Sequence, residues 1–356
     1  MLTISDLATG DSSTGEENYA SVHAQITQLR SAVTQSNKPY YDLELADENT
    51  KIKLKIWSGS AAFHFCEQSF KGDVCELEAK FFRNDYGLNV QDPRMRRLED
   101  EEKIIFFSGS PERRAQIDED WFYVCEVFES LSEPRLSLIT ANCLKQFETK
   151  WQRAAAARTY HHARRGGLIA HTSQMLRCAQ ALAPLYPEVT PDLLFSGILF
   201  HDIGKLWEND FPSEGFAVEQ TRSGELLGHI SMGIEIVNKL WREAVQENPE
   251  IFEDQEIPSP ILRDHLLHLI ASHHGELQYG APVTPKIPEA WLLHYIDNLD
   301  AKMEMMRGSY NQKIELCHEL YEAQRPLHGV VAKPLSQWSQ AEIEKSYEPS
   351  QSSLVE

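Results

Sequence analysis

The hydrophobic pattern of this 356-residue chain changes period once, and that change constrains the fold more than any other feature. Between Tyr19 and Leu98, apolar and polar residues alternate in short segments, a period typical of half-buried strands. In Lys51–Trp57, for example, three lysines occupy one face and isoleucine or leucine the other. From Trp121 onward, apolar residues recur with the spacing of helices. The pattern therefore predicts a β-domain followed by an all-α domain.

The expected elements follow from the same pattern. Strands are expected at Ser21–Leu29, Tyr40–Leu45, Lys51–Trp57, Val74–Phe82 and Leu88–Val90, and a short helix over residues 61–70. Five strands is the count of a small closed barrel of the OB type, with a generic β-domain as the alternative. Helices are expected at Trp121–Leu131, Pro134–Phe147, Leu168–Leu185, Pro191–Leu206, His229–Val245, Pro260–His273 and Pro288–Met306. The charged segment Glu99–Asp120 is expected to be a linker or a short covering segment.

Charge limits how the chain binds nucleic acid. It has 34 Lys and Arg against 54 Asp and Glu, and a net charge of −20 disfavours wholesale electrostatic capture of a polyanion. Residues 51–97 break this trend with nine basic and six acidic side chains, a local charge of +3. This region of the β-domain is therefore a candidate for binding nucleic acid.

The cysteines and the N-terminus bear on the compartment. Six widely spaced cysteines without a C-x-x-C pair predict reduced thiols rather than a disulfide framework or a zinc ribbon. The first ten residues lack a signal-peptide pattern, and no apolar run approaches the roughly 18 residues of a membrane span. We expect a cytoplasmic protein with no membrane partner. The oligomeric state stays open, with a homo-oligomer among the options.

Histidines concentrate in the predicted helical domain. Ten of the 14 lie between residues 161 and 294: His161, His162, His171, His201, His229, His265, His268, His273, His274 and His294. Histidine is the commonest side-chain metal ligand, so this clustering suggests a metal centre. A histidine taken singly is more often a helix cap or a solvated side chain.

The pair His201-Asp202 favours the metal interpretation. It follows the apolar run Leu193–Phe200, which predicts a buried helix. Burying a histidine and an aspartate costs several kcal/mol unless they are paired or bound to a metal. Gly204 then ends the helix, which places Lys205 near the same site, where it can neutralise an anion.

Further polar side chains lie at the ends of helices or on buried ones. His171 starts an amphipathic helix, His229 follows a glycine, and His273 and His274 end another helix. Asp297 lies three residues from His294 and three from Asp300, so the three share a helix face. We expect Asp300 to be an exposed carboxylate that pairs with Lys302 or its neighbours, rather than a ligand.

These residues carry a family resemblance. The order His171, His201-Asp202, Asp297 resembles the motif of HD-domain phosphohydrolases, and the added His229 and His273 resemble the subset that binds two metals. The strings around His229, around His273-His274 and over residues 293–303 are similar to those of YhaM-type 3′→5′ exoribonucleases, which carry an OB-fold ahead of the HD domain. The resemblance covers residues 160–306 closely and 20–98 loosely.

The resemblance implies a site for two divalent transition-metal ions, with manganese expected and iron, cobalt or nickel also compatible. Asp202 would bridge the metals, His171, His201 and Asp297 would hold the first, and His229 and His273 the second. Two such cations activate water for phosphodiester hydrolysis. Besides Asp202, Lys205 and His274 are expected in catalysis. Substrate contacts are expected from His162, Arg165, Lys205, His274, Lys55 and Arg83.

The expected function is metal-dependent 3′→5′ hydrolysis of single-stranded RNA, with DNA as a further substrate. Aromatic residues of the β-domain are expected to stack bases and its lysines and arginines to contact phosphates. The alternatives are a phosphodiesterase or phosphatase for nucleotides or cyclic dinucleotides, and a nucleic-acid-binding regulator with a non-catalytic HD scaffold. The expected organisation is an OB-fold domain at 1–98, a linker and helical lead-in at 99–150, an HD domain at 151–326 and a polar tail at 327–356.

Overall fold

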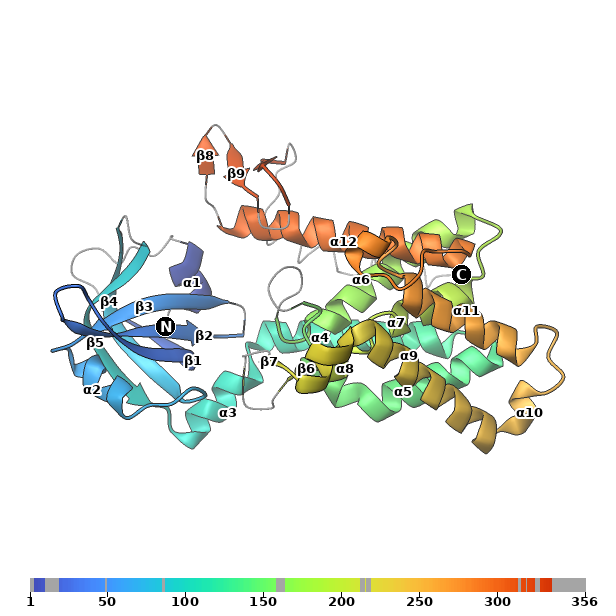
Figure 1. Ribbon diagram of the computed structural model, residues 1–356, viewed down its shortest axis with the longest axis horizontal. Helices are drawn as coiled ribbons and strands as arrows, with labels where there is room; N and C mark the ends of the chain where they lie inside the picture. Colours follow the sequence, from blue (N-terminus) through green and yellow to red (C-terminus); the bar gives the residue numbers. More distant parts are fainter. Residues whose placement is uncertain are drawn as a thin grey trace, which may run out of the picture. The chain divides into compact units, whose positions relative to one another are not determined.

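The computed structural model describes residues 3–9, 19–48, 50–84, 87–157, 164–211, 215, 219–312, 315–317, 319–323 and 327–334. The chain divides into two compact units, Met1–Glu304 and Met305–Glu356. The first unit contains a five-stranded sheet and a set of helices, each with a hydrophobic core of its own. Figure 1 colours the strands of this sheet blue to cyan and the helices that follow cyan to orange.

The N-terminal sheet is antiparallel throughout. Its strands are β1 (Ala20–Val33), β2 (Pro39–Ala46), β3 (Lys51–Trp57), β4 (Val74–Asn84) and β5 (Gly87–Arg97), in the order β3-β2-β1-β4-β5. The helix α2 (Ala61–Glu67) connects β3 to β4, and Ser60 caps its first turn. The helix α1 (Ile4–Thr9) packs its apolar side chains into the core of the sheet. The five strands and the helix after the third match the sequence prediction and give an OB-like arrangement.

The expected closure of this barrel is wrong for the described residues, because β3 and β5 form the two edges of the sheet and no ladder joins them. Features of the edge strand β5 explain why no further strand pairs with it. Asp92 and Pro93 lie opposite the single residue Ala79 of β4, and Asp92 has a φ of 50°. This bulge bends the strand, and Pro93 has no amide hydrogen to donate to a neighbouring strand. Such features are typical of strands that remain edges.

The expected linker at Glu99–Asp120 is helical instead. Residues Asp100–Ser108 form α3 and Pro111–Glu129 form α4. Glu99 and Glu102 form a reciprocal capping box at the start of α3. Ser110 accepts the Arg113 amide at the start of α4, where Pro111 is the first helical residue. Capping groups and an N-terminal proline favour helix formation even in a segment without strong hydrophobic periodicity.

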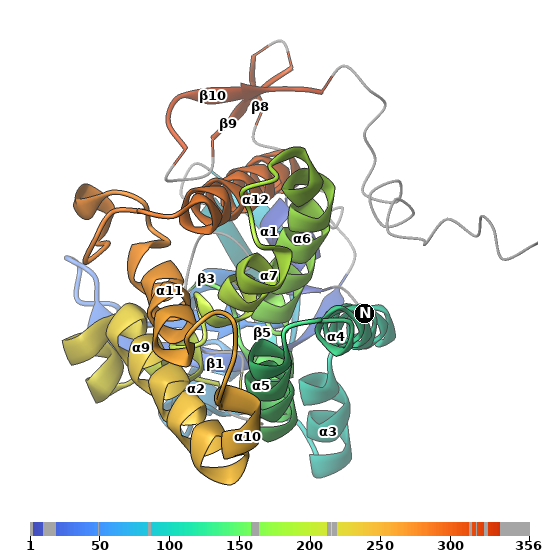
Figure 2. The same cartoon turned by 90° about the vertical axis from the view of Figure 1, so that its right-hand side faces the viewer.

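The remaining helices form the second core. They are α5 (Pro134–Arg153), α6 (Gly167–Leu182), α7 (Pro191–Phe200), α8 (Lys205–Glu208), α9 (Arg222–Glu247), α10 (Pro249–Phe252), α11 (Ser259–Ser272) and α12 (Pro288–Gln312), with short 3-10 turns η1 (Ala183–Leu185) and η2 (Leu277–Tyr279). Figure 2 shows α5, α7, α9 and α11 side by side, in agreement with their contacts. A two-stranded ladder, β6 (Asn209–Asp210) with β7 (Glu219–Gln220), follows α8. The predicted helices are therefore confirmed, with shifted ends.

The second unit contains a small sheet that the sequence pattern does not predict. Strands β8 (Glu315–Cys317), β9 (Leu320–Glu322) and β10 (Val330–Ala332) form a small antiparallel sheet in the order β10-β9-β8. Val330 and Val331 have the β-branched side chains that favour strands, and Val331 is buried. Residues 335–356 lie outside the described part of the chain. In the part that is described, no helix is long and apolar enough to cross a membrane.

Candidate metal centre

Six polar side chains from three helices and from the turns that follow two others converge in the helical domain. His171 lies in α6, and His201 and Asp202 follow the last turn of α7. His229 lies in α9, and Asp297 in α12. The remaining residue, His273, follows α11 directly and is itself followed by His274. These segments are up to 126 positions apart in the sequence, so only the tertiary fold brings the side chains together.

The side chains fall into two groups with Asp202 between them. Ligand atoms of His171, His201 and Asp297 all lie within 4.8 Å of one another, and so do those of His229, His273 and His274. Asp202 contacts both groups: its Oδ2 is 3.3 Å from His201 Nε2, and its Oδ1 is 3.5 Å from His229 Nε2. Its Oδ1 is also 3.7 Å from His273 Nε2. This arrangement has the form of two adjacent sites that share one carboxylate.

Three histidines of the centre donate a hydrogen bond through Nδ1, the ring nitrogen that does not face the other ligands. His201 Nδ1 donates to the Ile198 carbonyl, His273 Nδ1 to Ile270, and His274 Nδ1 to Tyr279, each at 2.8 Å. A carbonyl can only accept, so the proton resides on Nδ1 and Nε2 presents its lone pair. This is the arrangement typical of histidines that bind a metal through Nε2.

Two carboxylates orient the remaining histidines. Asp300 Oδ2 lies 2.6 Å from His171 Nδ1, and Glu208 Oε1 lies 3.4 Å from His229 Nδ1. Glu208 also accepts the His229 backbone amide at 3.1 Å. Both carboxylates contact the nitrogen that points away from the centre, which leaves Nε2 directed toward it.

Several buried atoms of the centre lack a partner. Within the described part of the chain, the Nε2 atoms of His201, His229 and His273 and the Oδ1 atom of Asp202 make no hydrogen bond. A buried polar atom left without a partner costs about 1–3 kcal/mol. Cations between these atoms would satisfy all of them at once, so the residues fit a metal site chemically.

The charges of the centre favour cation binding. Burial would raise the pKa of Asp202, but the positive charge of Lys205 and contacts with the neighbouring histidines hold it well below its usual range. Burial would likewise lower the pKa of His171, but the carboxylates of Asp297 and Asp300 raise it to about 10. Burial, together with the charge of His201, lowers the pKa of His273 far below its usual range. The centre therefore combines ionised carboxylates with a neutral His273 imidazole, and a cation bound at His171 would have to displace the proton that Asp297 and Asp300 stabilise there.

Three glycines shape the backbone around the centre, two by close approach and one by its conformation. A side chain at Gly204 would collide with the His229 carbonyl, and one at Gly275 would collide with the His294 ring. Gly228 has a φ of 69° and a ψ of 161°, which breaks α9 immediately before His229. Such a conformation is accessible to glycine and rare for other residues. The break lets the His229 amide point to Glu208 instead of continuing the helix.

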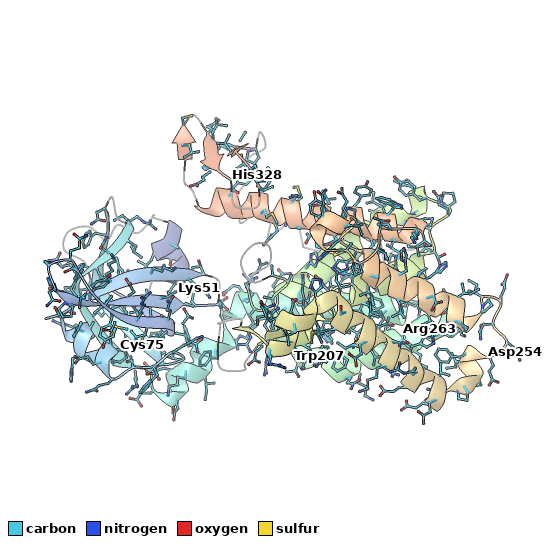
Figure 3. All side chains as sticks on the ribbon, in the orientation of Figure 1. Lys51, Cys75, Trp207, Asp254, Arg263 and His328 are labelled. Atoms are coloured by element: carbon cyan, nitrogen blue, oxygen red, sulfur yellow. The ribbon has the colours of Figure 1, made fainter. Side chains whose placement is uncertain are left out.

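Lys205 lies beside Asp202, near the centre as the sequence analysis expects. Its Nζ is 2.5 Å from Asp202 Oδ2, and α8 positions it one turn after the aspartate. Trp207 on α8, labelled in Figure 3, packs edge-on against Phe147 at 4.8 Å between ring centroids. Lys150 Nζ lies 4.2 Å from the centroid of the same ring. These contacts fix α8 and hence both Lys205 and Glu208.

The other predicted substrate contacts lie elsewhere or outside the described residues. Arg165 Nη1 donates to the Phe107 carbonyl at 2.9 Å, and Arg83 Nη2 donates to the Leu7 carbonyl at 2.8 Å, so both guanidiniums bind backbone. Lys55 is exposed on β3 and lies over the Tyr40 ring at 5.3 Å. His162 falls outside the described residues.

Two functional residues differ from the sequence interpretation. Asp300 was expected to be exposed and paired with Lys302, and this is wrong because it is 3% exposed and binds His171. Its position three residues after Asp297, on the same helix face, is the signal that identifies it. Glu208 carries no comparable signal, because its contact with His229 depends on the break at Gly228.

Comparison with known proteins places this site in a family. Residues 168–302 match the HD domain family. The chain is 31% identical over 291 residues to a protein of Geobacillus sp. (strain WCH70) named 3′-5′ exoribonuclease YhaM, covering 80% of this chain and 83% of that one. It is 32% identical over 288 residues to the protein of that name from Bacillus subtilis (strain 168), covering 79% and 84%. A structure of the second OB-fold domain of replication protein A from Methanococcus maripaludis aligns with a TM-score of 0.19 and 17% identity, over 23% of this chain and 86% of that one.

Proposed function

Because the chain belongs to the YhaM family of 3′-5′ exoribonucleases, we propose that it is a metal-dependent enzyme that shortens single-stranded RNA from the 3′ end. Single-stranded DNA is a second substrate of the same chemistry. The observation that carries the proposal is the convergence of Nε2 atoms and one shared carboxylate, each held from behind by a hydrogen-bond acceptor or a cation. The proposal is also supported by the relatives named 3′-5′ exoribonuclease, which match most of the chain.

The roles of the residues follow from their positions. His171, His201 and Asp297 would hold one cation, and His229 and His273 another, with Asp202 shared between them. Bound cations would lower the pKa of a water nucleophile and neutralise the phosphodiester. Lys205 holds Asp202 ionised and oriented through its 2.5 Å contact. His274 belongs to the second group by distance and would bind either the metal or a phosphate oxygen.

The donor set favours a transition metal. Three or more imidazoles with carboxylates accept manganese, iron, cobalt or nickel, and availability in the cell decides among them. We propose two manganese ions. The protein is proposed to act in the cytoplasm, and either a monomer or a homo-oligomer is compatible with a centre built from one chain.

The β-domain is proposed to hold the RNA strand. Tyr40 and Trp57 are paired across β2 and β3 with ring centroids 5.1 Å apart. Lys38 lies over the Trp57 ring and Lys55 over the Tyr40 ring, each at 5.3 Å. Aromatic rings flanked by cations stack unpaired bases and contact phosphates. Arg83, bound to the carbonyl of Leu7, would contribute to the surface charge rather than grip a phosphate.

We propose domain limits to match these roles. Residues 1–98 would bind nucleic acid and residues 151–326 would hydrolyse it. Residues 99–150 would join the two, and residues 327–356 would have no part in the chemistry.

One substitution tests the mechanism. Asp202→Asn keeps the volume of the side chain but removes the charge shared by both groups, so hydrolysis of end-labelled RNA with added manganese should fall by several orders of magnitude. Asp254→Asn, an exposed position between α10 and α11, serves as the control and should match the wild type. Full activity of Asp202→Asn, or wild-type hydrolysis in a chelator, would refute the metal mechanism. Hydrolysis of mononucleotides without shortening of RNA would favour the small-nucleotide phosphodiesterase instead.

A further inference from the structure

An aromatic row on α12 leads from the metal centre to the surface. His294 Nδ1 donates to the carbonyl of His273, a member of the second group, at 2.8 Å. The His294 ring lies 5.2 Å from the Tyr295 ring, and Tyr295 stacks on Trp291 with centroids 5.9 Å apart and planes 23° apart. The row thus starts one hydrogen bond away from a candidate metal ligand.

The outer rings of this row are exposed. Trp291 is 45% exposed and Tyr295 is 59% exposed, whereas His294 is buried. Neighbouring segments that carry candidate ligands also expose apolar side chains, among them Leu227, two residues before His229, and Tyr279, whose carbonyl binds His274. Apolar surface gathered beside a polar site marks a binding surface more often than a lone exposed residue does.

The exposed face of α12 is also free of negative charge. In a chain with a net charge of −20, the exposed positions of the described stretch 291–303 carry no carboxylate, and one of them is Lys302. Nearby acids are turned inward: Asp297 and Asp300 face His171, and Glu304 binds Arg164. A face with stacked rings, a lysine and no acid complements a strand of bases and phosphates.

We propose that Trp291 and Tyr295 stack the unpaired bases at the 3′ end of the RNA and so position the terminal phosphodiester at the metal centre. This inference rests on the proposed exonuclease function and adds a second base-binding surface to that of the β-domain. It also gives a physical reason for single-strand preference, because in a duplex the neighbouring base pairs cover the faces on which these rings would stack. Both residues are positioning residues that contact the substrate away from the reacting atoms.

The test compares substrates with and without bases. Trp291→Ala and Tyr295→Ala are measured on a tetranucleotide RNA and on the same strand with abasic riboses at its last two positions. On the intact strand, kcat/KM should fall about five- to a hundredfold, mainly through KM, since stacking contributes about 1–3 kcal/mol per base. Trp291→Phe should retain most of the activity. Phe122→Ala removes an exposed aromatic ring on α4 and should match the wild type.

The abasic strand identifies the cause. The wild type should lose a similar factor on it, and the alanine variants should lose nothing further. Variants that match the wild type on the intact strand, or that lose equally on both strands, would overturn the inference. A dimer in sedimentation that Trp291→Ala dissociates would assign this face to a second copy of the chain and would also overturn it.

Binding separates this inference from the proposed function. The affinity of each protein for the two strands is measured by fluorescence anisotropy in a chelator, where no hydrolysis occurs. A base-dependent loss of affinity in the variants, with no cleavage by the wild type in manganese, would refute the exonuclease function and leave the stacking surface intact. Cleavage by the wild type, with equal affinities in all variants, would refute the stacking surface alone.

Discussion

Replacing Asp300 with asparagine tests how the centre holds its first histidine. Asp300 Oδ2 lies 2.6 Å from His171 Nδ1, and both side chains are buried. Asparagine keeps the shape of the side chain and loses its charge. A hydrogen bond to a charged group contributes about 1.5–3 kcal/mol. Since 1.4 kcal/mol corresponds to a factor of ten, Asp300→Asn should weaken metal binding about ten- to a hundredfold, which is the range for residues that support metal ligands.

The measurement is calorimetric titration of the metal-free protein with manganese. Thermal denaturation of the same metal-free sample shows whether the variant is folded. Asp264→Asn is the matched control, because Asp264 is an exposed carboxylate on α11 that pairs with Arg263. Its manganese affinity should equal that of the wild type. A folded Asp300→Asn protein with wild-type affinity would refute the role assigned to this carboxylate.

Two further predictions concern the backbone of the centre and the β-domain. Gly204→Ala should lower the free energy of unfolding by about 1–3 kcal/mol in chemical denaturation, because its new methyl group collides with the His229 carbonyl; an unchanged midpoint would contradict the close approach of α9. Trp57→Ala should raise the KM for a long single strand about five- to a hundredfold and leave hydrolysis of a small phosphodiester unchanged, since it removes one stacking ring; equal KM values would exclude this face of the sheet from RNA binding.

Much of the candidate centre could be predicted from the sequence because its ligands violate the hydrophobic pattern. His201 and Asp202 end an apolar helix, and such placement has a cost that only pairing or a metal offsets. Asp297 shares this property on α12. The structure brings these residues together with His171, His229 and His273, and all four histidines are within 4.8 Å of other candidate ligands. The hydrophobic pattern predicts that these polar side chains are buried. A buried polar side chain must be paired or bound to a metal, so its burial indicates a ligand role.

For Asp300, the prediction of an exposed side chain was wrong, although the sequence contained the information needed to correct it. Its expected partner Lys302 lies two positions away, and side chains two positions apart on a helix do not face each other. Asp297 lies three positions away and does share its face. The helical geometry therefore argues for burial of Asp300 beside Asp297, and the structure has it there. Glu208 is different, because the approach of α8 to the broken start of α9 is a tertiary contact with no local sequence pattern.

The surface charge of the β-domain is a second property that the sequence alone predicts poorly. The local +3 counts residues 51–97, but partners of its cations lie on both sides of that window. Glu44 on β2 pairs with Lys51 and Lys53, and Glu102 on α3 pairs with Arg96. A charge count along the chain therefore overstates the field that a phosphate meets, because strand pairing brings acids from outside the window onto the same surface. Lys38 and Lys55 lie over the half-buried rings of Trp57 and Tyr40, so each can contact a phosphate beside a stacked base. Their substitution should therefore weaken RNA binding more than the loss of Lys53 does.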